Sequence, residues 1–127
     1  GFKPQWLGIS SLKSDELIKL AGDITEGMIV ASEGVDEKNS EYIAFRDKYK
    51  ARFGEDPTIY AVNGYDAVKL LSKLIAEYGN DSEKVKNALY TLTGYVGAGG
   101  KLSFDRNGDA IREIKLFVVQ NGKFVSL

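Results

Sequence analysis

Residues 53–71 read FGEDPTIYAVNGYDAVKLL and contain the end of one predicted helix and the start of a longer one. Gly54 and Pro57 end the first helical pattern, because glycine commonly terminates helices and the residue before a proline avoids the helical conformation. Helically spaced apolar residues then continue to Tyr78, so we expect a helix over about residues 59–78. Its apolar positions form a broad arc, which favours burial on more than one side: Ala61, Val68, Leu71, Leu74, Ile75 and Tyr78.

Other helices are expected on both sides of this segment. After Ser40, aromatic residues recur at spacings of 3, 4 and 4, and such a stripe more often packs in a core than forms a ligand platform. A short helix is expected to begin after Ser14 and to end at Gly22. A further helix is expected after Asp81 or Ser82, either of which can cap it. The apolar sets are Tyr42, Phe45, Tyr49 and Phe53, then Leu17, Leu20 and Ala21, then Val85, Ala88, Leu89 and Leu92.

Short apolar runs predict strands before and after the helices. Asn121-Gly122 matches a two-residue type I′ hairpin turn. Gly97–Gly100 follows a helix and precedes a strand, the reverse of a phosphate-binding loop, so we interpret it as a flexible crossover. The expected strands are Gln5–Ile9, Gly27–Ala31, Lys101–Phe104, Ile114–Val119 and Lys123–Val125. The element order is β-α-β, three helices and a β-rich tail, which indicates an α/β fold.

Composition excludes several classes of protein. The chain has 127 residues, 17 basic and 18 acidic, so it lacks the basic surplus typical of a nucleic-acid binder. It contains no His and no Cys, which removes cysteine metal sites, disulfides and Ser-His-Asp catalysis. Histidine- and cysteine-dependent catalysis is therefore excluded, and we expect no metal site and no cofactor. The chain begins with Gly1 and shows neither an initiator Met nor a signal peptide, as expected of a processed product or an excised fragment.

Two groups of polar residues are candidate sites. Ser10 and Ser11 follow the first predicted strand, where α/β proteins often bind small ligands. Their hydroxyl groups are suited to a polar ligand, or alternatively to capping the helix at Ser14; as a nucleophile, Ser10 would lack a histidine base, leaving only a pair with Lys13. The segment Asp105–Asp109 has alternating acidic and amide residues; it lacks the spacing of a calcium loop and predicts a turn, with calcium as the alternative.

Five stretches together resemble one protein family. They are LGIS at residues 7–10, LIKLAGDITEGMIVAS at 17–32, FRDKYKARFGEDPTIYAVNGYDAVKLLSKLI at 45–75, KVKNALYTLTGYVGAGGKLSFDRNGDA at 84–110 and VVQNGKFV at 118–125. Their order and spacing are similar to the C-terminal part of type I periplasmic binding proteins. The branch is the Leu/Ile/Val-binding group that serves ABC transporters.

The resemblance implies an incomplete type I periplasmic-binding-protein fold, a three-layer α/β/α lobe with a helical block from a second lobe. Residues 1–31 would then form a β-α-β segment of the C-terminal lobe. Residues 32–95 would be a helical block belonging to the N-terminal lobe. Residues 96–127 would return to the C-terminal lobe as a β-rich tail.

The resemblance also implies a function without catalysis. A small polar solute, such as an amino acid, an amide or an organic acid, would be held between two lobes for delivery to an ABC transporter permease. Ser10 and Ser11 would contact it from one lobe and Tyr65 from the other. Many amino-acid binders of the family place an acidic residue in this loop, so serine there argues against an α-amino acid ligand. The alternatives are the ligand-sensing domain of a receptor or regulator and, less favoured, a small α/β hydrolase.

This interpretation predicts the protein's surroundings. The protein would be periplasmic or extracellular, with a lipoprotein anchor outside this chain as one arrangement. The helices of residues 40–92 would lack the sheet of the missing N-terminal lobe. They would fold back, leave apolar surface exposed, or pair with a second copy, and we expect a homodimer by segment exchange. With half of the cleft absent, the isolated chain should bind little solute.

Overall fold

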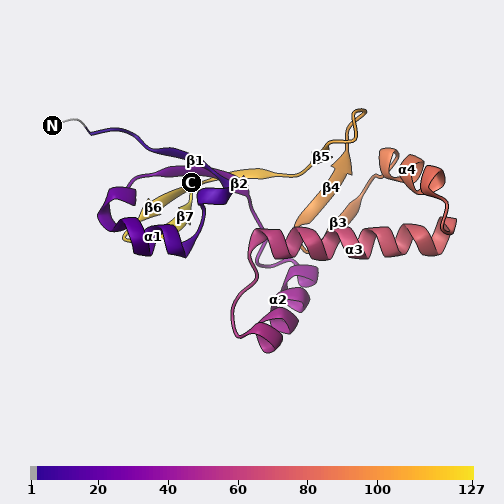
Figure 1. The fold of residues 1–127 in the computed structure, drawn as a ribbon, viewed down its shortest axis with the longest axis horizontal. Helices are drawn as coiled ribbons and strands as arrows, with labels where there is room; N and C mark the ends of the chain where they lie inside the picture. Colours follow the sequence, from indigo (N-terminus) through magenta and orange to yellow (C-terminus); the bar gives the residue numbers. More distant parts are fainter. Residues whose placement is uncertain (1–2) are drawn as a thin grey trace. The chain divides into compact units, whose positions relative to one another are not determined.

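The computed structural model of the protein describes residues 3–127, which divide into two units (Figure 1). Unit 1 consists of residues 3–34 and 114–127, and unit 2 of Val35–Glu113. The chain therefore forms the first part of unit 1, builds all of unit 2, and then completes unit 1. The predicted boundary at residues 31/32 is close to the first junction, whereas the one at 95/96 lies inside unit 2.

Unit 1 contains a four-stranded mixed sheet with the strand order β1-β2-β6-β7. The pair β1–β2 is parallel, and β6 is antiparallel to both β2 and β7. Asn121 and Gly122 both have positive φ, at 52° and 69°, which confirms the predicted type I′ turn. The strands are β1 (Leu7–Ile9), β2 (Ile29–Glu33), β6 (Ile114–Gln120) and β7 (Lys123–Ser126).

One face of this sheet is covered and the other is not. Val30 and Val119 are fully buried with Met28 beneath α1 (Asp15–Ala21), which contributes Leu17 and Ile18. Two short 3-10 turns, η1 (Ser10–Leu12) and η2 (Gly22–Thr25), flank α1. Strand pairing places a second set of apolar residues together on the opposite face, where all are exposed: Leu7, Ile9, Leu116, Val125 and Leu127. We refer to these five residues as the open sheet face.

Unit 2 contains the three predicted helices. Asn39, Thr58 and Asp81 are the N-cap residues, and each side chain accepts a hydrogen bond from a first-turn amide. Gly54 ends the first helix in a left-handed conformation. The helices are α2 (Ser40–Phe53), α3 (Ile59–Tyr78) and α4 (Ser82–Tyr90).

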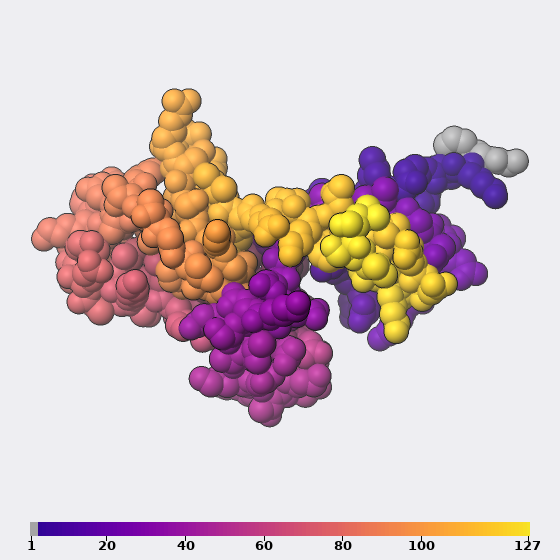
Figure 2. All heavy atoms as spheres, turned by 180° about the vertical axis from the view of Figure 1, so that it is seen from behind, coloured from indigo at the N-terminus to yellow at the C-terminus, as the bar shows by residue number. Residues whose placement is uncertain are grey.

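The glycine-rich segment of unit 2 is a hairpin and not a flexible crossover, so that interpretation was wrong. β3 (Tyr95–Gly97) pairs antiparallel with β4 (Gly100–Phe104), and β4 pairs with β5 (Ala110–Ile111). Gly97 lies opposite Gly100, whose φ of 89° closes the tight turn between them. The second turn, between β4 and β5, projects from the surface of unit 2 (Figure 2).

The long helix α3 is buried along one side only. Val62, Leu70 and Leu74 face the interior, where they pack in two clusters with α2, α4 and the β3–β4 hairpin. The opposite side is exposed in this chain, contrary to the expectation of burial on more than one side. We refer to its exposed apolar residues as the α3 stripe: Tyr60, Val68, Leu71, Ile75 and Tyr78.

Candidate functional site

Ser10 and Ser11 lie together directly after β1. They form the first two residues of η1, where the Lys13 amide donates to the Ser10 carbonyl over 3.1 Å. Ser10 is half-buried and Ser11 is exposed. Because β1 runs parallel to its neighbour β2, both hydroxyl groups lie at the carboxyl end of a parallel strand pair, a usual ligand position in α/β proteins.

Capping of α1 is carried out by a different serine. The Ser14 hydroxyl oxygen accepts from the Leu17 amide over 3.2 Å, and Asp15 and Glu16 supply negative charge to the first turn. The capping alternative for Ser10 and Ser11 is therefore wrong for α1.

A positive charge lies in the same turn. The Lys13 ammonium nitrogen is 3.6 Å from the centroid of the Phe117 ring on β6, in cation–π geometry. A turn that carries two hydroxyl groups and one lysine is chemically suited to donate hydrogen bonds to amide or carboxylate oxygens.

Tyr65 lies on the other unit, in α3, and packs in an aromatic cluster. Its ring stacks on Phe45 with centroids 4.3 Å apart and an interplanar angle of 25°. The Lys69 ammonium lies 5.4 Å from the ring centroid and donates to a Glu41 carboxylate oxygen over 2.9 Å, which raises the lysine's pKa. The structure thus brings Ser10 and Ser11 together in unit 1 and gives Tyr65 a packing role in unit 2.

Sequence reasoning missed the most deeply buried polar group of unit 2. Asp66 on α3 is fully buried. Its Oδ1 accepts from the Ala98 amide over 2.7 Å, and its Oδ2 accepts from the Gly99 amide over 2.9 Å. Arg112 donates from Nη2 to the same Oδ2 over 3.1 Å, and only 8% of its side chain is exposed. A buried carboxylate with three donors is a satisfied charge, and its hydrogen bonds hold these neighbours in place.

The sequence contained a signal for this group. Val62, Asp66, Leu70 and Leu74 follow one another at intervals of four, so the acid lies within an otherwise apolar helix face. Glycine is required opposite it, because a Cβ at Gly97 would overlap the Asp66 carboxylate and one at Gly99 would overlap the Arg112 guanidinium. Burial, followed by the negative charge of Asp66, raises the pKa of the nearby Tyr95 hydroxyl.

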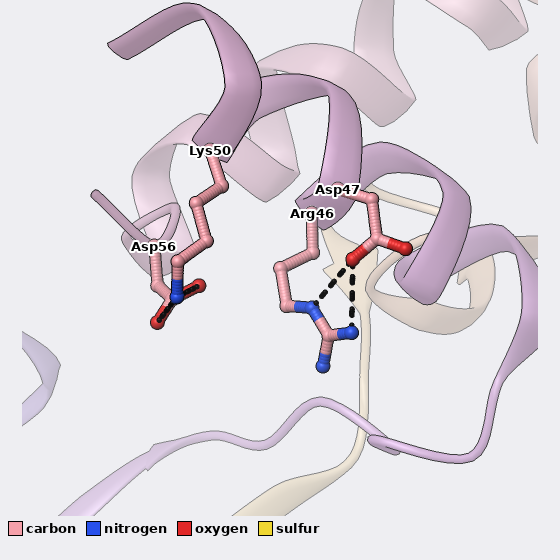
Figure 3. Close-up of polar contacts among 4 residues, drawn as sticks. All are labelled: Arg46, Asp47, Lys50 and Asp56. Atoms are coloured by element: carbon pink, nitrogen blue, oxygen red, sulfur yellow. Dashed lines mark hydrogen bonds and ion pairs between the residues drawn. The ribbon is translucent and has the colours of Figure 1, made fainter. Parts of the chain in front are cut away.

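Two ion pairs formed by residues of α2 are solvent-exposed, unlike the buried pair of Asp66 and Arg112. Figure 3 shows Arg46 donating from Nε and Nη2 to Asp47 Oδ1 over 3.1 and 2.9 Å, and Lys50 3.2 Å from both Asp56 oxygens. All four side chains reach solvent. Such pairs contribute little to stability because water competes for them.

Other features of unit 2 do not form a chemical site. A shallow groove of about 510 Å³ follows β3, β4 and Ile111–Glu113, and none of Ser10, Ser11 and Tyr65 lines it. The Asp105 carboxylate stabilises the β4–β5 turn, because its Oδ1 accepts from the amides of Asn107 and Asp109 over 2.8 and 2.9 Å. Over residues 3–127, no group of three or more acidic side chains is arranged to hold a metal ion.

Comparison with known proteins assigns the chain to a family. Residues 1–123 match the family model described as periplasmic binding protein, so the chain belongs to that family. The predicted resemblance to the Leu/Ile/Val-binding branch is confirmed, because curated relatives are named as binding proteins for leucine, isoleucine and valine.

Three relatives illustrate the likeness. The leucine-, isoleucine-, valine-, threonine- and alanine-binding protein of Pseudomonas aeruginosa is 31% identical over 86% of this chain, which spans only 29% of that relative's length. A leucine-binding protein of Thermotoga maritima is 28% identical to this chain, with a TM-score of 0.85. The match covers 100% of this chain and 37% of the Thermotoga maritima chain. A solute-binding protein of R. palustris in complex with benzoate is 25% identical to this chain, with a TM-score of 0.75. The match covers 97% of this chain and 35% of the R. palustris chain.

These comparisons confirm the incomplete type I periplasmic-binding-protein fold. By name, these relatives are binding proteins for amino acids. None of the helices within residues 3–127 combines the length and the hydropathy needed to span a bilayer.

Proposed function

We propose that this chain is part of a longer solute-binding protein that holds a small polar solute between two lobes. The observation that carries the proposal is the Ser10–Ser11 turn at the carboxyl end of the parallel β1–β2 pair, in a chain of the periplasmic binding protein family. Hydroxyl groups at this position bind polar groups without a catalytic base, and the chain contains no histidine to activate them.

The solute class follows from the charges of this turn. An α-amino acid has an ammonium group that is best paired with a carboxylate, and η1 contains none. The two hydroxyl groups of the turn can instead donate to a carboxylate or amide oxygen. Among amino acids, amides and organic acids, the proposal therefore favours organic acids and amides, and Tyr65 is proposed to face the solute from unit 2.

The two units are proposed to belong to the two lobes, unit 1 to the C-terminal and unit 2 to the N-terminal one. The open sheet face and the α3 stripe support this assignment, because an α/β lobe normally has helices on both faces of its sheet and a sheet beneath its helices. The missing two-thirds of the relatives' length would supply both. This proposal places the two lobe junctions at 34/35 and 113/114 instead of the predicted 31/32 and 95/96, so residues 96–113 are proposed to belong to the N-terminal lobe and not, as predicted for 96–127, to the C-terminal one. Delivery to an ABC transporter permease, a periplasmic or extracellular location and a lipoprotein anchor stay predictions.

Isothermal titration calorimetry tests the proposal on the longer protein that contains this sequence. A panel of branched-chain amino acids, their amides, and aliphatic and aromatic carboxylic acids should include one class that binds one to one. Ser10→Ala and Ser11→Ala should each weaken that binding by about 2- to 12-fold, the value of one neutral hydrogen bond. Ser82→Ala, on α4, is the matched control and should leave the affinity unchanged. Unchanged affinity in both Ser10→Ala and Ser11→Ala would contradict the site.

The 127-residue chain itself should bind little or none of the same solutes, because most of both lobes is absent from it. Titration of the chain with the panel checks this expectation, and a tight complex would show that the cleft is already complete.

A further inference from the structure

The chain passes between the two units twice, at Gly34–Val35 and at Glu113–Ile114. We infer that Asn39, Asp66 and Arg112 anchor both passing segments to one turn of unit 2 and so define where the hinge between the units bends. This inference rests on the proposed function, in which two lobes close around a solute. The three residues are positioning residues, since none of them is proposed to touch the solute.

Asn39 anchors the first passing segment. Its Nδ2 donates to the Gly97 carbonyl over 2.8 Å, while its Oδ1 accepts from the Glu41 amide over 3.0 Å and caps α2. One side chain therefore joins the start of the helix to the β3–β4 hairpin. Ahead of Asn39, Val35 packs against the core of unit 2, and the Asn39 amide donates to the Asp36 carbonyl over 2.9 Å, so the first passing segment is held close to Gly34.

Arg112 anchors the second passing segment, one residue before unit 2 ends. Its Nη2 lies 3.1 Å from Asp66 Oδ2, and both side chains are at least nine-tenths buried. A buried, charge-assisted hydrogen bond has a narrow range of geometries, unlike the solvated pairs of Figure 3. The chain after Arg112 thus leaves unit 2 from a fixed point.

Both anchors meet on three consecutive residues. Asn39 binds the carbonyl of Gly97, and Asp66 accepts from the amides of Ala98 and Gly99. A hinge bends at a few residues between rigid bodies. With both anchors in place and Val35 packed against unit 2, bending is confined to the chain next to Gly34 and next to Glu113, so the two segments act as one hinge instead of two independent tethers.

Distance measurements between two spin labels test the inference on the 127-residue chain. The chain contains no cysteine, so Lys19→Cys on α1 and Lys73→Cys on α3 give two exposed labelling positions, one on each unit. Double electron–electron resonance then reports the distribution of distances between the units. We expect Asn39→Asp and Arg112→Gln each to widen this distribution at least about twofold relative to the labelled parent.

The variants are chosen to separate anchoring from folding. Asn39→Asp removes the donor to Gly97 and keeps a residue that caps helices equally well. Arg112→Lys restores a cation beside Asp66 and should recover part of the narrow distribution. Arg46→Gln is the matched control, since it removes an exposed arginine pair from the same unit and should leave the width unchanged. Far-UV circular dichroism establishes that each variant is folded, and Asn39→Asp still decides the matter if Arg112→Gln does not fold.

An unchanged width in the folded variants, or equal widening in Arg46→Gln, would overturn the inference. Because no solute is present in this experiment, its result is separate from that of the titration. A widened distribution together with absent solute binding would remove the proposed function alone.

Discussion

Gly97 illustrates how one residue is constrained by a distant one. A Cβ at this position would overlap the carboxylate of Asp66, which is buried and held by three hydrogen bonds. We expect Gly97→Ala to lower the free energy of unfolding by about 1–3 kcal/mol, because the hairpin backbone or the buried acid must shift to admit the methyl group. Urea unfolding followed by circular dichroism measures the change.

Gly64→Ala is the matched control for this substitution. Gly64 lies inside α3, and a Cβ there would meet open space. Alanine favours a helix over glycine, so this variant should be more stable by about 0.5–1 kcal/mol. Equal effects of the two substitutions would show that Asp66 does not constrain Gly97.

Asp105 should titrate below the ordinary range for aspartate. The backbone amides of Asp109 and Asn107 donate to its carboxylate, which lowers the pKa of this side chain. A lowered pKa in the folded state means that the charged form stabilises the turn above the ordinary aspartate pKa, and that this stabilisation is lost as pH falls through the lowered value. An NMR titration of the side-chain carboxyl carbon measures the shift.

Asp105→Asn provides the comparison for this titration. The asparagine oxygen also accepts from backbone amides, so the β4–β5 turn should persist while its dependence on acidic pH disappears. A carboxyl group that titrates at or above the ordinary aspartate value would contradict the arrangement of the turn.

At the scale of secondary-structure elements, α1 tests whether the neighbouring serines have distinct roles. Ser14 caps this short helix through the Leu17 amide. Ser14→Ala should therefore lower the free energy of unfolding by about 1 kcal/mol, whereas exposed Ser11→Ala should change it by less than about 0.5 kcal/mol. Thermal and urea unfolding of the two variants compare them directly. A larger loss of stability in Ser11→Ala than in Ser14→Ala would contradict the assignment of Ser14 as the cap.

Helices were more predictable than the small sheet of unit 2. Each helix has its own start and stop signals, such as the Asn39, Thr58 and Asp81 caps, and these act within one turn. The β3–β4 hairpin depends instead on Asp66, a contact between residues far apart in the sequence. A run of glycines carries no side-chain pattern, so the sequence alone could not reveal that partner.

The candidate site was predictable to the same local extent. Ser10 and Ser11 could be placed at a strand end because the strand and the following helix cap are both encoded nearby. The surroundings of Tyr65 could not be predicted, since its stacking on Phe45 joins two helices. Asp66 was detectable in principle as an acid at every-fourth-residue spacing within an apolar face.

At the scale of the whole molecule, exposed apolar surface should make the isolated chain self-associate. The α3 stripe and the open sheet face offer a helix and a sheet without covering partners. Light scattering should give a mass that rises with concentration toward a dimer, and exchange of residues 40–92 between copies is one route to it.

Substitutions on the stripe test its contribution. Val68→Lys combined with Ile75→Lys should shift the mass toward that of a monomer with little loss of stability, because both side chains are already exposed. Lys84→Gln on α4 is the control and should leave the association unchanged. A chain that stays monomeric at every concentration would contradict the expectation.

The divided sequence of unit 1 has a consequence during protein synthesis. β2 precedes unit 2 in the chain, and β6, its neighbour in the sheet, follows it. On the ribosome, Val30 can therefore pack against Val119 only after all of unit 2 has been translated. The early strands would spend that interval as an apolar nascent chain, and we expect them to be bound by chaperones until translation delivers the last two strands.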